Sequence, residues 1–252
     1  MSSPTRRPVT TAAVAVVAIV VAGALSACGG EPETRGPSGV DGLVIPTPAP
    51  DPADFVEGID NPWLPLTPGA SWEYDVTEGP GSTVTVTVTD RTREVEGVAT
   101  TVVDVVTADE GRVTEVAREL YAQDAGGNVW RFGERTTTYD GRGRVESREG
   151  WEAGADGARA GLAMAADPRV GDGYREGYLP GVAEDVAEVL AVDQALTLDA
   201  GSWNPVVLTA DRSELEPGVV EQRYFARGVG LVLVDTVAGG DRRLELASYS
   251  AS

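Results

Sequence analysis

Hydrophobic and polar residues alternate along most of the chain after residue 55. Residues 83–89 read Thr-Val-Thr-Val-Thr-Val-Thr, which places valines on one face of an extended strand and threonines on the other. Comparable stretches recur to the end of the chain. They predict strands over residues 98–106, 113–123, 129–139, 144–151, 182–192, 206–210, 219–225, 231–237 and 242–249. Residues 184–192 would also tolerate a short helix.

The connections between these stretches are short and rich in residues that favour turns. Asp124-Ala-Gly-Gly-Asn128 reads as a hairpin loop and residues 140–143 as a tight turn. Short connections favour antiparallel neighbours, so the first half predicts a meander. The predicted fold is mainly β, an antiparallel twisted sheet closing into a sandwich or partial barrel. Residues 152–180, rich in Gly, Ala and Asp, predict a loop-rich insertion.

The first 27 residues have the composition of an export signal. Arg6 and Arg7 precede an apolar run from Val9 to Leu25. The run ends in Leu25-Ser-Ala-Cys28, which resembles the lipobox of bacterial lipoproteins. That resemblance implies removal of residues 1–27 and a palmitate-type lipid on Cys28, the only cysteine. A transmembrane anchor is the alternative for this run, and the paired arginines leave Sec and twin-arginine export both open.

Residues 28–54 are rich in Pro and Gly and predict a tether between the lipid and the folded part. Residues 55–252 are long enough for a single β-rich domain with its own core. The expected location is outside the cytoplasm, with the protein held at the cell membrane through the lipid on Cys28.

Composition removes several classes of function. The formal net charge is −20, and loss of Arg6 and Arg7 with the signal would make it more negative. No basic patch is visible in the sequence, so we expect no nucleic-acid binding. The chain has no histidine, which excludes a Ser-His-Asp triad and an imidazole metal site. We expect no cofactor.

Two groups of residues could carry chemistry. Asp124 and Asn128 could supply oxygen ligands to a hard cation such as calcium, although a hairpin also needs Asx residues with glycines. An acid-rich region could supply a carboxylate pair for hydrolysis, although solvated carboxylates are the common outcome in so acidic a chain. The residues of this acid-rich region are Asp172, Glu176, Glu184, Asp185 and Glu188, with Asp167 beside them.

Three stretches resemble a group of uncharacterised secreted bacterial proteins: residues 61–69, 121–134 and 170–176. The resemblance implies a recurring domain and no assigned activity. We therefore expect a non-enzymatic protein that is anchored in the cell envelope by lipid. Its expected partner is either a small apolar ligand, bound on a concave face of the sheet, or another envelope protein. The alternatives are a carboxylate-dependent cell-surface hydrolase and a passive structural or adhesion module. An apolar cavity would favour ligand carriage, and two carboxyls facing each other in a cleft would favour hydrolysis.

Overall fold

The computed structural model describes residues 50–77 and 81–251. The predicted signal segment, Cys28 and nearly all of the predicted tether lie outside the described residues. Within the described part, no helix is both long enough and apolar enough to span a membrane. The helical structure there is a single 3-10 turn, η1 (Pro52–Asp54), capped by the Asp51 carboxylate, which accepts from the Ala53 N–H at 2.9 Å.

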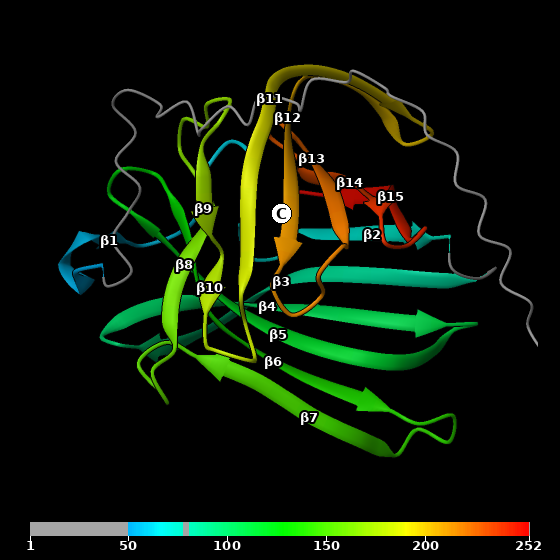
Figure 1. Cartoon of the computed structure of the whole chain (residues 1–252), viewed down its shortest axis with the longest axis horizontal. Helices are drawn as coiled ribbons and strands as arrows, with labels where there is room; N and C mark the ends of the chain where they lie inside the picture. Colours follow the sequence, from blue (N-terminus) through cyan, green and yellow to red (C-terminus); the bar gives the residue numbers. More distant parts are fainter. Residues whose placement is uncertain (1–49, 78–80, 252) are drawn as a thin grey trace, which may run out of the picture. The chain divides into compact units, whose positions relative to one another are not determined.

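The rest of the described chain is built from strands and turns (Figure 1). The strands are β1 (Phe55–Val56), β2 (Ser71–Val76), β3 (Ser82–Val95), β4 (Val98–Asp109), β5 (Arg112–Asp124), β6 (Val129–Tyr139), β7 (Val145–Glu152), β8 (Arg159–Met164), β9 (Gly173–Arg175), β10 (Gly177–Tyr178), β11 (Asp185–Leu198), β12 (Gly201–Ser213), β13 (Val220–Ala226), β14 (Gly230–Ala238) and β15 (Arg243–Ser250).

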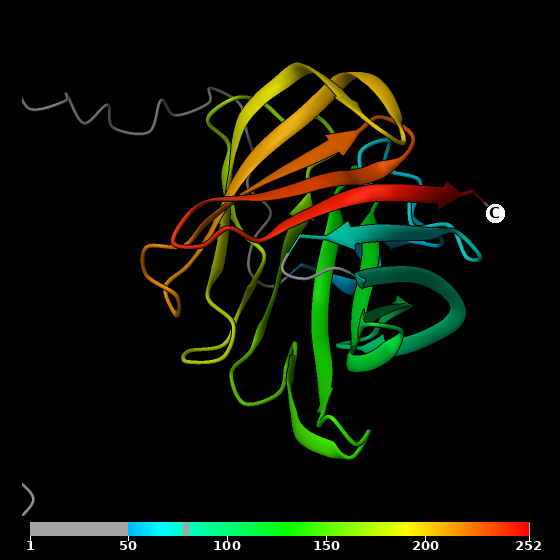
Figure 2. The same cartoon turned by 90° about the vertical axis from the view of Figure 1, so that its right-hand side faces the viewer.

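These strands form one antiparallel sheet made of two meanders. Strands β2 to β6 are successive neighbours, β11 to β15 are successive neighbours, and β15 pairs with β2 to join the two sets. The sheet twists until it is nearly closed into a barrel-like shape (Figure 2). The predicted antiparallel sheet closing into a partial barrel is confirmed.

The predicted loop-rich stretch contains the segment that brings the two ends of the sheet together. Strand β9 pairs with β11 on one side, and β10 pairs with β8 on the other. Only Glu176 separates β9 from β10, so Gly173–Tyr178 is one extended segment that belongs to both ends. Gly161 of β8 lies directly against it, because a Cβ built there would come within 2.3 Å of the Glu176 carbonyl carbon.

Residues 185–192 belong to strand β11, which begins directly after Glu184, and not to a helix. This stretch pairs with β12, from Asp185 opposite Ser213 to Ala191 opposite Leu208. Ala187 and Val189 alternate with the exposed Glu188 and are buried. Two-residue periodicity and a partner strand on each side therefore outweigh the local helix tolerance.

The core draws its buried side chains from both halves of the sheet. Its largest fully buried apolar side chains are Val88, Val103, Val129, Trp130, Phe132, Met164, Val189, Val206, Val207 and Val232. Phe55 closes over Trp130 and Phe132 with edge-to-face contacts at 6.3 and 5.2 Å between ring centroids.

Candidate functional site

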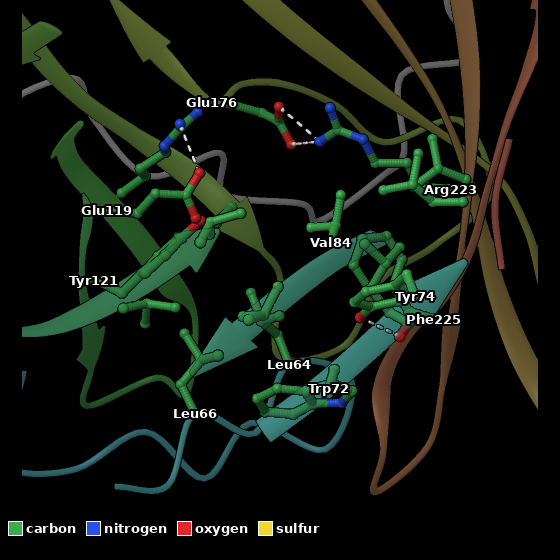
Figure 3. Close-up of a pocket in the computed structure, with 18 of the residues that line it drawn as sticks. Leu64, Leu66, Trp72, Tyr74, Val84, Glu119, Tyr121, Glu176, Arg223 and Phe225 are labelled. Carbon is green, nitrogen blue, oxygen red and sulfur yellow. Dashed lines mark hydrogen bonds and ion pairs between the residues drawn. The ribbon is translucent and has the colours of Figure 1, made fainter. Parts of the chain in front are cut away.

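The interior of the sheet holds a cavity of about 290 Å³ (Figure 3). Side chains from β2 to β6 line one wall, and side chains from β13 to β15 line the other. Leu64 and Leu66 come from the segment that precedes β2. Most of the lining is apolar, and the rest is a set of arginines and glutamates.

The apolar lining follows from strand alternation. Val84 and Val86 of β3 and Val103 and Val105 of β4 point inward, because residues two apart share a face of a strand. The valine face predicted from residues 83–89 is therefore partly the wall of a cavity. It is not a completely filled core.

The two aromatic residues of β2 have their polar atoms satisfied within the protein. The Trp72 Nε1–H donates to the Val229 carbonyl at 2.7 Å, and the Tyr74 hydroxyl donates to the Leu231 carbonyl at 2.9 Å. Burial raises the pKa of Tyr74, so its hydroxyl stays protonated. Both residues therefore contribute apolar ring surface to the cavity.

One charged cluster is built on the β5–β6 hairpin. Glu119 and Glu134 are opposite each other in the register, a repulsive arrangement for two carboxylates. Arg131 bridges them, with one guanidinium nitrogen 3.0 Å from Glu119 and in contact with Glu134. The Tyr121 hydroxyl donates to Glu119 at 2.8 Å. Burial lowers the pKa of Arg131, but Glu119, Tyr121 and Glu134 together raise it above its ordinary value.

A second charged cluster is built on the β12–β13 hairpin around Arg223. Its Nε lies 2.7 Å from the Asp211 carboxylate, and its terminal nitrogens lie 3.3 Å from Glu176 and 3.4 Å from Glu221. Asp211 and Glu176 are only 5 % and 9 % exposed in their side chains, so both depend on Arg223 for compensation.

Glu176 is a loosely held carboxyl of the cavity. Its contacts to Arg223 are long for a charged pair, at 3.3 and 3.4 Å. Burial, opposed by Arg223 and reinforced by Asp211, raises the pKa of Glu176 to about 7. Burial, opposed by Arg223 and Thr209, also raises the pKa of Asp211. Burial therefore disfavours the charged form of Glu176 in the cavity.

The structure disperses the predicted acidic region. Of its members, only Glu176 lines the cavity. Asp172 is buried in the turn before β9 and accepts from the Arg169 N–H at 2.8 Å. Glu184 is partly exposed and accepts from the Gly181 N–H. Glu188 pairs with Arg212 at 3.6 Å, both about half exposed.

The two remaining acids of the predicted region are Asp185 and Asp167. Asp185 begins β11 and raises the pKa values of Glu176 and Asp211 electrostatically. Asp167 is 88 % exposed and contacts Arg169 at 3.8 Å. The predicted acids thus do not form one site.

Asp124 and Asn128 lock the β5–β6 hairpin. One Asp124 oxygen accepts from the Asn128 N–H at 2.9 Å, and the other accepts from the Trp130 Nε1–H at 2.9 Å. The Asn128 side-chain amide donates to both oxygens. A cation could enter only by displacing these donors. Among the residues that the structure describes, no group of three or more Asp, Glu, Cys or His is placed to hold a metal ion.

Sequence reasoning missed Glu119, Tyr121, Arg131 and Arg223 as cavity residues. Arg131 lies between Trp130 and Phe132, and Arg223 lies directly before Tyr224. An arginine alternating with aromatic residues was the available signal, because on a strand it faces opposite to its neighbours. The sequence does not say whether that opposite face is solvent or an enclosed space.

Comparisons with known proteins assign no family and no function to the chain. No protein-family model matches the chain, and no curated protein matches it. Among solved structures, the chain is similar to a crystal structure of a candidate lipoprotein from Parabacteroides distasonis. The identity is 11 % and the TM-score 0.39, over 75 % of this chain and 98 % of that one. A TM-score this low carries no argument, so no function is transferred.

Proposed function

We propose that the protein is lipid-anchored in the cell envelope and that its β domain binds a small amphipathic molecule inside the sheet. The observation that supports ligand binding is the interior cavity, with an apolar lining and a set of arginine–carboxylate pairs. Its volume of about 290 Å³ is at the lower end of the range of roughly 300–1,000 Å³ for ligand pockets. The ligand is therefore small.

The lining defines the ligand's chemistry. Trp72, Phe225 and the inward valines offer apolar contact, so the main body of the ligand is apolar. Glu176 offers an acceptor whose present contacts are long, so the ligand carries a hydroxyl or amine donor at that end. This refines the small apolar ligand expected from the sequence.

Filling the cavity tests the proposal. Val86→Trp places an indole in the cavity, and we expect at least a tenfold loss of affinity for the fluorescent probe N-phenyl-1-naphthylamine. The matched control is Thr85→Trp, since Thr85 is on the opposite face of β3. Fluorescence titration of the full-length protein measures both. Equal affinity for wild type and Val86→Trp, or no binding by wild type, would contradict the proposal.

A carboxylate-dependent hydrolase is the second candidate. It is favoured by one specific observation: Glu119 and Glu176 line the same cavity, and the pKa of Glu176 is raised to about 7. Against it, each carboxylate is paired with an arginine. Turnover in an esterase and glycosidase panel that is lost in Glu176→Gln and kept in the exposed control Glu188→Gln would establish this candidate.

The anchor has a separate test. Cys28→Ser removes the thiol that would carry the lipid, so we expect complete loss of labelled palmitate incorporation and release of the protein from the membrane fraction. Fractionation of expressing cells and mass measurement check this result. Unchanged membrane retention and unchanged mass would contradict the lipobox interpretation.

A further inference from the structure

The outer face of β4 to β6 carries a second groove, of about 760 Å³. Val102, Arg118 and Leu120 line this groove, whereas Val103 and Glu119 line the interior cavity. Alternation along β4 and β5 therefore gives one sheet two unlike faces. The end of β3 and the strand β7 also contribute to the lining of the groove.

Arginines gather in this groove although the chain as a whole is strongly acidic. Five exposed arginines line it: Arg91, Arg93, Arg118, Arg135 and Arg148. Asp104 contacts two of them, Arg91 at 2.5 Å and Arg118 at 3.5 Å. Glu152 pairs with Arg93 at 2.6 Å. Three more acids line the groove, Glu134, Glu149 and Asp156, of which Glu134 binds Arg131.

The strand register brings three of the arginines together. Arg118 of β5 is directly opposite Arg135 of β6, and Arg148 of β7 is opposite Thr137, two residues along from Arg135. Neighbouring strands are about 4.8 Å apart, so these side chains share one small area. Within the described residues, neither Arg135 nor Arg148 forms an ion pair.

Arg135 has no side chain directly opposite it on β7. The residue opposite it on β7 is Gly150, and a Cβ there would come within 2.3 Å of the Glu134 carbonyl oxygen. Like charges placed opposite each other in a sheet are destabilising unless an anion compensates them. The register thus leaves a positive side chain on the outer face with only a glycine opposite it on β7.

We propose that this groove binds a phosphate group through Arg118, Arg135 and Arg148. Planar guanidinium groups donate paired N–H bonds to phosphate oxygens, and they stay charged at every physiological pH. Glu149 and Asp156 at the same groove favour a single compact anion over a long polyanion, because further negative charge would meet these carboxylates. The phosphate belongs either to a lipid headgroup or to a soluble phosphate compound.

The test uses the full-length protein with Cys28→Ser, titrated with pyrophosphate by calorimetry. We expect binding that weakens with added salt and that falls at least tenfold in Arg118→Gln/Arg135→Gln. The matched control is Arg212→Gln, an exposed arginine on β12 outside the groove, which should stay within twofold of wild type. Arg135 has no ion pair to lose, so the single variant Arg135→Gln serves if the double variant does not fold.

A second arm distinguishes the sources of phosphate. Sedimentation with phosphatidylglycerol vesicles, compared with phosphatidylcholine vesicles, measures headgroup binding. Arginine-dependent binding to pyrophosphate and to phosphatidylglycerol assigns the site to membrane headgroups, and binding to pyrophosphate alone assigns it to a soluble compound. No binding of either, or equal binding by wild type and the double variant, would overturn the proposal.

Discussion

Gly161→Ala is expected to lower the free energy of unfolding by about 3 kcal/mol, because a new methyl group would overlap backbone atoms that cannot move independently. The Cβ would come within 2.3 Å of the Glu176 carbonyl carbon and the Gly177 nitrogen, and within 2.4 Å of the Arg175 carbonyl oxygen. To admit it, β8 must separate from the segment that joins the two ends of the sheet. Urea denaturation of the full-length protein measures the change.

The same substitution should also disturb the cavity, since Glu176 is in that segment and lines it. Gly141→Ala is the matched control. A Cβ at Gly141 meets nothing within 4 Å, so its unfolding free energy should change by about 0.5 kcal/mol or less. Equal stability of the Gly161 and Gly141 variants would show that the sheet does not close through Gly173–Tyr178.

Arg223→Met is expected to cost about 3 kcal/mol at pH 8, because it removes the cation from two buried carboxylates. Asp211 and Glu176 would then lie in the sheet interior with Glu221 nearby and no compensating charge from β13. Denaturation measured at pH 8 and at pH 5 tests both the size of the cost and its origin.

The pH dependence has a definite sign. The pKa of Glu176 is about 7 in the folded protein against 4.5 for the unperturbed group, so the folded state holds a proton that the unfolded chain has lost. Stability therefore falls as pH rises from about 4.5 to 7. Loss of Arg223 raises the pKa values of Glu176 and Asp211 further. The deficit of the variant should consequently be largest at pH 8 and shrink toward pH 5, where protonation neutralises the carboxyls.

Arg212→Met on the neighbouring strand is the matched control. Arg212 and its partner Glu188 are about half exposed and 3.6 Å apart, so removing the pair should cost less than about 1 kcal/mol at either pH. A pH-independent loss in Arg223→Met would attribute its effect to packing and contradict the electrostatic account.

The amino-acid sequence by itself determined most of the strands and their antiparallel order, but not β8, β9 and β10, which lie in the stretch predicted to be loop-rich. Alternation such as that of residues 83–89, bounded by glycine and Asx turns, leaves a strand as the structure that buries one face and hydrates the other. Short connections then make successive strands neighbours, which is the observed order of β2 to β6. The sequence of residues 184–192 was also compatible with a short helix. Only the pairing of this stretch with β12 in the folded protein decided in favour of a strand.

Only the tertiary structure decided what the charged residues do. Arg131, Arg223 and Glu176 are far apart in the sequence, and they line one cavity because Gly173–Tyr178 joins both ends of the sheet. Arg118 and Arg135 become neighbours through the register of β5 and β6, and that register depends on a bulge near Leu120. Alternation assigns a side chain to a face of a strand. Whether that face encloses a cavity, fills a core or meets solvent depends on how the sheet curves, which is set by contacts between distant residues.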